Sequence, residues 1–180
     1  MIYLFLADGF EEVEALCPLD LLRRAGCAVT TVGVGGTEIR GAHGITVTAD
    51  IPAEFYKDSA PEMVILPGGM PGAKNLAASA TVKAAVTAAA THGAFLCAIC
   101  AAPMILGQMG LLAGKKATCY PGFEEKLNGA DKVRDRVVRD GNIITAAGMG
   151  VALPFGLSLV EALCGKANAD ALRAAVLADE

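Results

Sequence analysis

The chain has 180 residues, of which 54% are hydrophobic and 19% are charged, and its formal net charge is -4. This length and composition favour a compact, mostly buried fold with a substantial core. The acidic balance and the lack of a basic run argue against nucleic acid as a partner. No linker or repeat interrupts the chain, so we predict a single domain over residues 1–180.

The predicted elements alternate between strands and helices along the chain. In order they are a strand over 2–6, a helix over 11–25 with Pro18 as a bend or restart, a strand over 28–34, a hairpin over 39–48, a strand over 63–66, a helix over 82–91, a strand over 95–99, a helix over 104–109, a hairpin of strands 133–139 and 143–146, and helices over 153–164 and 167–178. Strands this apolar, alternating with helices, predict an α/β fold with a mainly parallel sheet that is covered on both faces.

The start of the chain and its cysteine content bear on cellular location. Residues 1–6 lack the basic region of a signal peptide, and Asp8 interrupts the apolar run early. No segment approaches the uninterrupted apolar length that spans a membrane. We therefore expect a cytoplasmic protein with no membrane contact. The six cysteines are then expected to be free thiols rather than a disulfide framework.

Cys100 is the first candidate for chemistry, because it ends the most apolar run of the chain. Pro103 suits the first turn of the following helix, so Cys100 is predicted to lie at a strand-to-helix turn. Unpaired backbone N–H groups and the positive end of a helix dipole would face its sulfur there. Such surroundings favour the nucleophilic thiolate. The alternative is that Cys100 is a small hydrophobic residue of the core.

A glycine-rich loop, residues 67–72, follows the strand over 63–66. In a parallel sheet, sites form at the carboxyl ends of strands, so this loop is expected near Cys100. Glycines let the backbone approach a ligand closely. The N–H groups of Gly69 and Ala101 are candidates for stabilising an oxyanion, and Gly68 is a further candidate residue. The alternative is a plain tight turn.

Glu14 is the third candidate, in the segment that follows the first strand. Glu11 and Glu12 suit a first helical turn through the helix dipole alone, but Glu14 lies between Val13 and Ala15 and is able to point inward. A carboxyl group held beside a thiolate is driven toward its protonated form, and so becomes a proton donor and acceptor. The alternative is a solvated glutamate.

Other common sites are disfavoured. Cys97 and Cys100 have the spacing of a redox dithiol, but Cys97 is predicted to lie inside the strand, where it would be inaccessible. No dinucleotide fingerprint or phosphate loop is present, so we expect no cofactor. With only His43 and His92 and no paired ligand spacing, we expect no metal site.

Four segments together resemble the ThiJ/PfpI superfamily, most closely the branch of the Parkinson's-disease protein deglycase (DJ-one) and its bacterial ThiJ-type relatives. They are ADGFEEVEALCPLDLLRRAG, VILPGGMPGAKNL, AFLCAICAAPMIL and VEALCGK, in the family's order over nearly the whole chain. The resemblance implies a flavodoxin-like three-layer sandwich and a homodimer. It also implies an oxidation-sensitive nucleophile at Cys100, a partner carboxyl at Glu14, and oxyanion donors from the backbone of Gly69 and Ala101.

The family's activities include cofactor-free conversion of methylglyoxal to lactate (glyoxalase III type), deglycation of proteins, and chaperone and oxidative-stress roles. Three positions depart from family patterns. Ala101 replaces the histidine of the intracellular-protease branch, which disfavours a peptidase. Tyr120 stands where histidine is frequent in the deglycases, and a phenol is a poor base at neutral pH. His43 stands in place of an arginine that reaches toward the partner subunit's site.

Three functions therefore compete. The leading hypothesis is a cofactor-independent enzyme that acts on small 2-oxoaldehydes or glycated proteins, with Cys100 as nucleophile and Glu14 as proton shuttle. The second is a non-enzymatic oxidative-stress sensor or chaperone in which Cys100 oxidises to a sulfinate. The third is a cysteine hydrolase of another kind.

Overall fold

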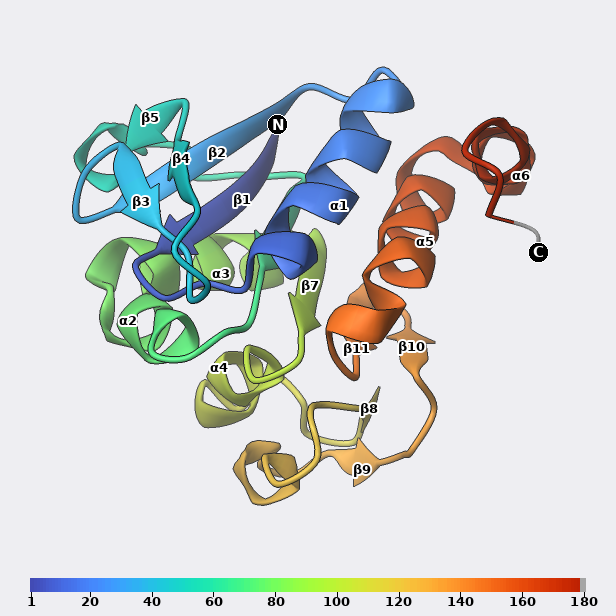
Figure 1. Ribbon diagram of the computed structural model, residues 1–180. Coiled ribbons are helices and arrows are strands. Elements are labelled where there is room, and N and C mark those ends of the chain that lie inside the picture. The colour runs from blue at the N-terminus through green and yellow to red at the C-terminus, as the bar shows by residue number, and fades with distance from the viewer. Residues whose placement is uncertain (179–180) are drawn as a thin grey trace.

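The computed structural model describes residues 1–178 and contains a seven-stranded sheet between two layers of helices (Figure 1). The strands of this sheet are β1 (Ile2–Ala7), β2 (Val29–Val34), β5 (Ile51–Pro52), β6 (Met63–Leu66), β7 (Phe95–Ile99), β10 (Val137–Asp140) and β11 (Ile143–Ala146). The helices are α1 (Glu12–Arg24), α2 (Gly72–Ala78), α3 (Ala80–Thr91), α4 (Pro103–Gln108), α5 (Ala152–Cys164) and α6 (Lys166–Ala175).

The strand order is β10-β11-β7-β6-β1-β2-β5, and every neighbouring pair is parallel except β10 with β11. Taken in chain order, β1, β2, β6, β7 and β11 form the flavodoxin-like order 2-1-3-4-5. The predicted α/β class, mainly parallel sheet and flavodoxin-like sandwich are therefore confirmed. Two small sheets lie outside it: the predicted hairpin of β3 (Glu38–Arg40) with β4 (Thr46–Thr48), and β8 (Lys116–Ala117) with β9 (Asp131–Lys132).

Alternation along the strands creates two cores. In β1, Phe5 and Ala7 pack in one cluster with residues of α2, α3 and α4, whereas Leu4 and Leu6 pack in the other with residues of α1, α5 and α6. Successive side chains of a strand point to opposite faces, so a strand that is apolar at every position fits a sheet buried on both sides. This arrangement leaves the carboxyl edge of the sheet as the place where loops can form a site.

Helix α1 runs through Pro18 as one helix, so of the two expected effects of this proline, a bend or a restart, the restart is absent. Glu11 caps its N-terminus, because the Glu11 carboxylate accepts a hydrogen bond from the Glu14 backbone N–H at 2.8 Å. Gly26, at φ +79°, lies just beyond its C-terminal end. Pro18 is buried where α1 packs against α5, and a Cβ built on Gly156 of α5 would lie 3.0 Å from the Pro18 Cα. The close helix pair is visible in Figure 1.

Short elements account for most of the differences from the predicted order. Helix α2 and strands β5, β8 and β9 were not predicted, because segments of two to seven residues carry too little periodicity. The predicted strand over 133–139 begins only at Val137, since the Val133 N–H instead bonds the Ala117 carbonyl beside the small β8–β9 sheet. The last helix ends at Ala175 rather than Ala178.

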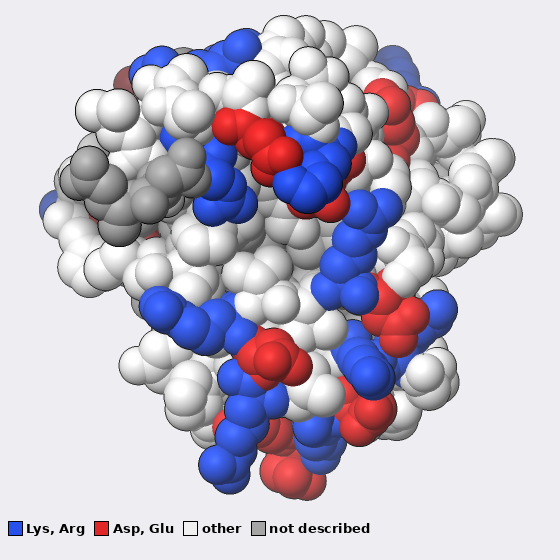
Figure 2. Space-filling model, turned by 90° about the vertical axis from the view of Figure 1, so that its right-hand side faces the viewer, with Lys and Arg blue, Asp and Glu red and all other residues white. Residues whose placement is uncertain are grey.

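Basic and acidic side chains are interspersed on the face of the molecule that Figure 2 shows, with uncharged surface between them. Within residues 1–178, none of the helices is both long enough and apolar enough to cross a bilayer.

The α1–α5 contact generates a stability prediction. Gly156→Ala would place its Cβ 2.6 Å from Leu21 Cδ1 as well as against Pro18, so we expect unfolding free energy to fall by roughly 1–3 kcal/mol. Gly150→Ala is the control, because its Cβ would meet nothing closer than Arg136 Nη2 at 3.7 Å. Chemical denaturation measures both. Equal midpoints for the two variants would contradict this account of the helix contact.

Candidate active site

Three neighbouring strands bring the predicted residues to one edge of the sheet. Glu14 follows β1, Gly68 and Gly69 follow β6, and Cys100 follows β7, which are adjacent in the order β7-β6-β1. A Cβ built on Gly68 would lie 2.6 Å from both the Cys100 Cβ and the Glu14 Oε2. The predicted convergence of these segments is therefore present, and Gly68 lies between the two reactive groups.

Cys100 occupies a sharp turn between β7 and α4. Its φ is +63°, in the left-handed region that non-glycine residues rarely adopt. Its backbone N–H donates to the Ala146 carbonyl at 2.9 Å, and its carbonyl accepts from the Tyr120 N–H at 2.8 Å. These two bonds hold a strained nucleophile turn of the kind that presents a side chain above a sheet edge. Pro103 is the first residue of α4, as predicted.

The carboxyl group of Glu14 lies inside the protein and is hydrogen-bonded to the backbone of the glycine loop. Glu14 is only 1% exposed, and its Oε2 accepts a hydrogen bond from the Gly68 N–H at 3.0 Å. Burial raises the pKa of Glu14 to about 7; hydrogen bonds from the Cys100 thiol and Gly68 lower it, and the charge of Glu11 raises it. The inward orientation that the sequence predicts is thus present. The pKa of Glu14 is raised as predicted, but the cause is burial and not a neighbouring thiolate, because the Cys100 thiol lowers that pKa.

Cys100 is a thiol in the resting protein. Burial raises its pKa to about 12, together with the charge of Glu14 and the hydrogen bond to it, while hydrogen bonds from the Gly69 and Ala101 N–H groups lower it. The thiolate expected at a helix N-terminus is therefore not the resting state, because burial and the neighbouring carboxylate of Glu14 outweigh the backbone N–H donors. Between these two pKa values Glu14 and Cys100 share one proton.

The glycines of the 67–72 loop are required by close packing. Gly69 has φ +85°, and a Cβ there would lie 2.3 Å from the Glu11 backbone nitrogen and 2.6 Å from the Gly9 carbonyl oxygen. The loop is tied to the start of α1 by the hydrogen bond from the Glu11 N–H to the Gly68 carbonyl, at 3.0 Å. The loop is thus more than a plain turn, since its backbone contacts both reactive side chains.

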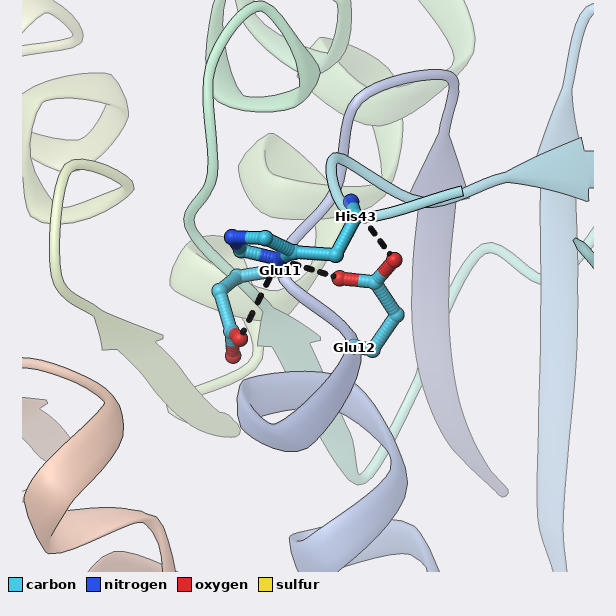
Figure 3. Close-up of side chains that lie close together, drawn as sticks. All are labelled: Glu11, Glu12 and His43. Carbon is cyan, nitrogen blue, oxygen red and sulfur yellow. Dashed lines mark hydrogen bonds and ion pairs between the residues drawn. The ribbon is translucent and has the colours of Figure 1, made fainter. Parts of the chain in front are cut away.

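Tyr120 and His43 contribute in different ways. Tyr120 supports the Cys100 turn through its backbone, while its side chain is 51% exposed and its ring lies 3.2 Å from a Cβ built on Gly148. The His43 ring is also largely exposed, and its Nδ1 lies 3.0 Å from Glu12 Oε2 and 3.9 Å from Glu11 Oε1 (Figure 3). Within residues 1–178, neither side chain forms a hydrogen bond or an ion pair with Cys100.

The group around His43 was missed in the sequence. Potential ligand atoms of Glu11, Glu12 and His43 lie within 4.8 Å of one another, from segments 31 residues apart. Glu12 is 4% exposed and accepts bonds from the backbone N–H groups of His43, at 2.8 Å, and Ile45, at 3.4 Å. The hydrogen bond and the charge of Glu12 raise the pKa of His43. This group anchors the 41–45 loop over the start of α1.

The flavodoxin-like sheet with a cysteine–carboxyl pair at its edge defines the class of protein, and comparison with known proteins defines the family. The protein-family model described as "DJ-1/PfpI family" matches residues 1–162 of this chain. The chain therefore belongs to the DJ-1/PfpI family, and the resemblance drawn from its sequence is confirmed.

Individual relatives agree with this assignment. Protein DJ-1 homolog B of Arabidopsis thaliana is 41% identical over 91% of this chain, which spans only 38% of that longer protein. The Parkinson disease protein 7 homolog of Danio rerio is 36% identical over 96% of this chain and 94% of its own. Glutathione-independent glyoxalase DJR-1.2 of Caenorhabditis elegans is 30% identical over 92% of this chain and 89% of its own.

A solved structure with the same fold is that of Toxoplasma gondii DJ-1, oxidized. It is similar to this chain with a TM-score of 0.94 and 32% identity, over 98% of this chain and 97% of the other.

The shared proton generates a prediction about reactivity. Iodoacetamide should alkylate Cys100 before the other cysteines, because Glu14 in contact with it can take up the thiol proton. Those cysteines are Cys17, Cys27, Cys97, Cys119 and Cys164. The rate should rise as pH passes about 7, since protonated Glu14 cannot accept that proton. Mass-spectrometric mapping measures both, and first labelling of another cysteine would be inconsistent with this site.

Proposed function

We propose that the protein is a cofactor-independent cysteine enzyme that converts small 2-oxoaldehydes such as methylglyoxal to hydroxy acids. The observation that carries the proposal is the Cys100–Glu14 pair, which shares one proton in a site supplied with two backbone N–H donors. A nucleophile and a proton shuttle with a pKa near 7 are what such an isomerisation needs. One named glyoxalase among the relatives supports the reaction class.

The reaction follows from the positions of these groups. Glu14 accepts the thiol proton as the Cys100 sulfur adds to the aldehyde carbon, and the product is a hemithioacetal. Glu14 then moves a proton from the former aldehyde carbon to the neighbouring carbon through an enediol, which leaves a thioester on Cys100. Water hydrolyses the thioester, releases the hydroxy acid and restores the thiol. Removal of an early glyoxal adduct from a glycated protein would begin with the same nucleophile.

The N–H groups of Gly69 and Ala101 serve two stages of this scheme. In the resting protein they donate to the Cys100 sulfur and lower its pKa. When the sulfur becomes bonded to carbon, the same donors are free to stabilise the negative oxygen that develops beside it. The strained turn at Cys100 keeps the sulfur near these donors throughout.

A second candidate function is redox sensing, with or without chaperone activity. A Cys100 sulfinate would accept hydrogen bonds from Gly69, Ala101 and protonated Glu14, which are the groups already around the sulfur. A cysteine hydrolase of another kind is the third candidate, and a screen of esters and amides tests it. A peptidase is disfavoured, because Ala101 leaves no histidine next to the nucleophile.

Glu14→Gln separates catalysis from sensing. Glutamine keeps the size of the side chain and the acceptor for the Gly68 N–H, but it cannot exchange a proton as a carboxyl group does. Turnover of methylglyoxal should fall by roughly 10²-fold or more. Assays of lactate formation, with circular dichroism to verify folding, measure the effect.

The exposed Glu161→Gln variant is the matched control and should keep wild-type turnover. Near wild-type activity of Glu14→Gln would eliminate Glu14 as the proton shuttle. If the wild-type protein itself shows no turnover, the redox-sensor function becomes the better proposal.

We further propose that the protein acts as a homodimer. Apolar side chains at the start of α1 and α5 are exposed in the single chain: Val13 at 43% and Leu153 at 36%, with Met149 nearby in sequence at 52%. Leu16 and Leu19 are half-buried, whereas Leu22 belongs to the core. Covering such surface is a usual role of a subunit interface.

Sedimentation should therefore give the mass of a dimer at micromolar concentration. Val13→Asp should shift the distribution toward monomer, because it places a charge in the apolar surface. A monomeric mass for the unmodified protein would refute the dimer and remove any role for His43 at a partner's site.

A further inference from the structure

Cys27 and Cys164 form a second thiol pair, remote in sequence and separate from Cys100. Their Sγ atoms lie 3.5 Å apart although the residues are separated by 137 positions. Cys27 precedes β2, and Cys164 is the last residue of α5. Both side chains are half-buried and pack at the margin of the same core cluster. A single cysteine there would be explained as a small hydrophobic residue that packs in the core. Two sulfur atoms in contact are, in addition, placed where they can react with each other.

The backbone on both sides of the pair is fixed. The Cys27 N–H donates to the Leu22 carbonyl at 3.0 Å, directly after the left-handed turn at Gly26. The Cys164 carbonyl accepts from Asn168 Nδ2 at 2.7 Å. Since a disulfide has an S–S length of about 2.05 Å, the sulfurs must approach by roughly 1.5 Å. We expect rotation of the two side chains to supply that movement while these backbone bonds persist.

We propose that Cys27 and Cys164 are an oxidation site that closes to an intramolecular disulfide and reopens on reduction. The oxidant class is a hydroperoxide. One thiolate attacks the peroxide, takes an oxygen to become a sulfenic acid and releases hydroxide or water. The other sulfur then displaces that oxygen and forms the S–S bond. In sum, two thiols and one hydrogen peroxide give one disulfide and two waters, and a dithiol reductant reverses the change.

Attack on an oxidant needs one of these sulfurs as a thiolate, which forms more readily as pH rises. Burial, followed by the hydrogen bond with Cys164 and the charges of Cys164 and Glu62, raises the pKa of Cys27 to about 11. The disulfide would join the segment after α1 to the end of α5, two helices that already pack together. The pair loses two electrons to the oxidant when the disulfide forms, and Cys100 takes no part in this step. The proposal therefore does not depend on the proposed enzyme activity.

Peptide mapping tests the proposal in a Cys100→Ser background, which removes the other reactive thiol. Trypsin places Cys27 in peptide 25–40 and Cys164 in peptide 140–166, each with a single cysteine. The protein is treated with hydrogen peroxide at mildly alkaline pH, blocked with iodoacetamide and digested. We expect the two peptides to become linked in the monomeric band of a non-reducing gel, with a loss of two free thiols that dithiothreitol restores.

Variants separate this pair from other thiols. Adding Cys27→Ser or Cys164→Ser should each abolish the linked peptide, whereas Cys17→Ser should leave it unchanged. The proposal is overturned if peptides 25–40 and 140–166 stay unlinked while both cysteines remain alkylatable. It is equally overturned if the linkage occurs only between two chains, or if Cys27 joins a cysteine other than Cys164.

Discussion

The contact between a buried carboxyl group and a thiol organises the edge of this sheet. Glu14 is almost fully buried, and a charged carboxylate there is costly unless hydrogen bonds or a shared proton compensate it. The Gly68 N–H and the Cys100 thiol supply that compensation. Both require the glycine loop, because a Cβ on Gly68 would occupy the space between the two side chains. The strained backbone at Cys100 is a second requirement of the same contact.

This arrangement costs stability at neutral pH. Burial raises the pKa of Glu14 from 4.5 to about 7, so the folded protein binds the proton more tightly than the unfolded chain. Protonation of Glu14 therefore stabilises the folded state fully below about pH 4.5, and this stabilisation is lost as pH rises through about 7. Its size is on the order of 3 kcal/mol, since each pKa unit corresponds to about 1.4 kcal/mol. Strongly shifted pKa values that lower stability are common at sites where a side chain must exchange protons.

Much of this organisation could be predicted from the sequence. Long apolar strands and the helices between them carry strong periodic signals, so the parallel sheet and its carboxyl edge were predictable, and so was the convergence of Cys100, Glu14 and Gly69 there. The inward direction of Glu14 rested on its neighbours Val13 and Ala15. Family motifs then supplied the expected roles of these residues.

Other features have no signal in the linear chain. The seven residues of α2 are too few for a recognisable period. The contacts between Cys27 and Cys164, and between His43 and Glu12, join segments 137 and 31 residues apart, and only the folded chain brings them together. The protonation state of Cys100 could not be predicted from the neighbouring sequence either, because its pKa depends on burial and on the charge of Glu14 rather than on the helix that follows. Burial and the carboxyl group of Glu14, not the helix dipole, determine the protonation state of this thiol.

Direct titration of the Glu14 carboxyl group by carbon-13 NMR is the most direct test of the shared proton. In the wild-type protein its midpoint should lie near pH 7. In Cys100→Ala the midpoint should move higher, because the carboxylate loses the hydrogen bond from the thiol while its burial remains. A wild-type midpoint close to the ordinary glutamate value of 4.5 would contradict the account, and so would a midpoint that Cys100→Ala leaves unchanged.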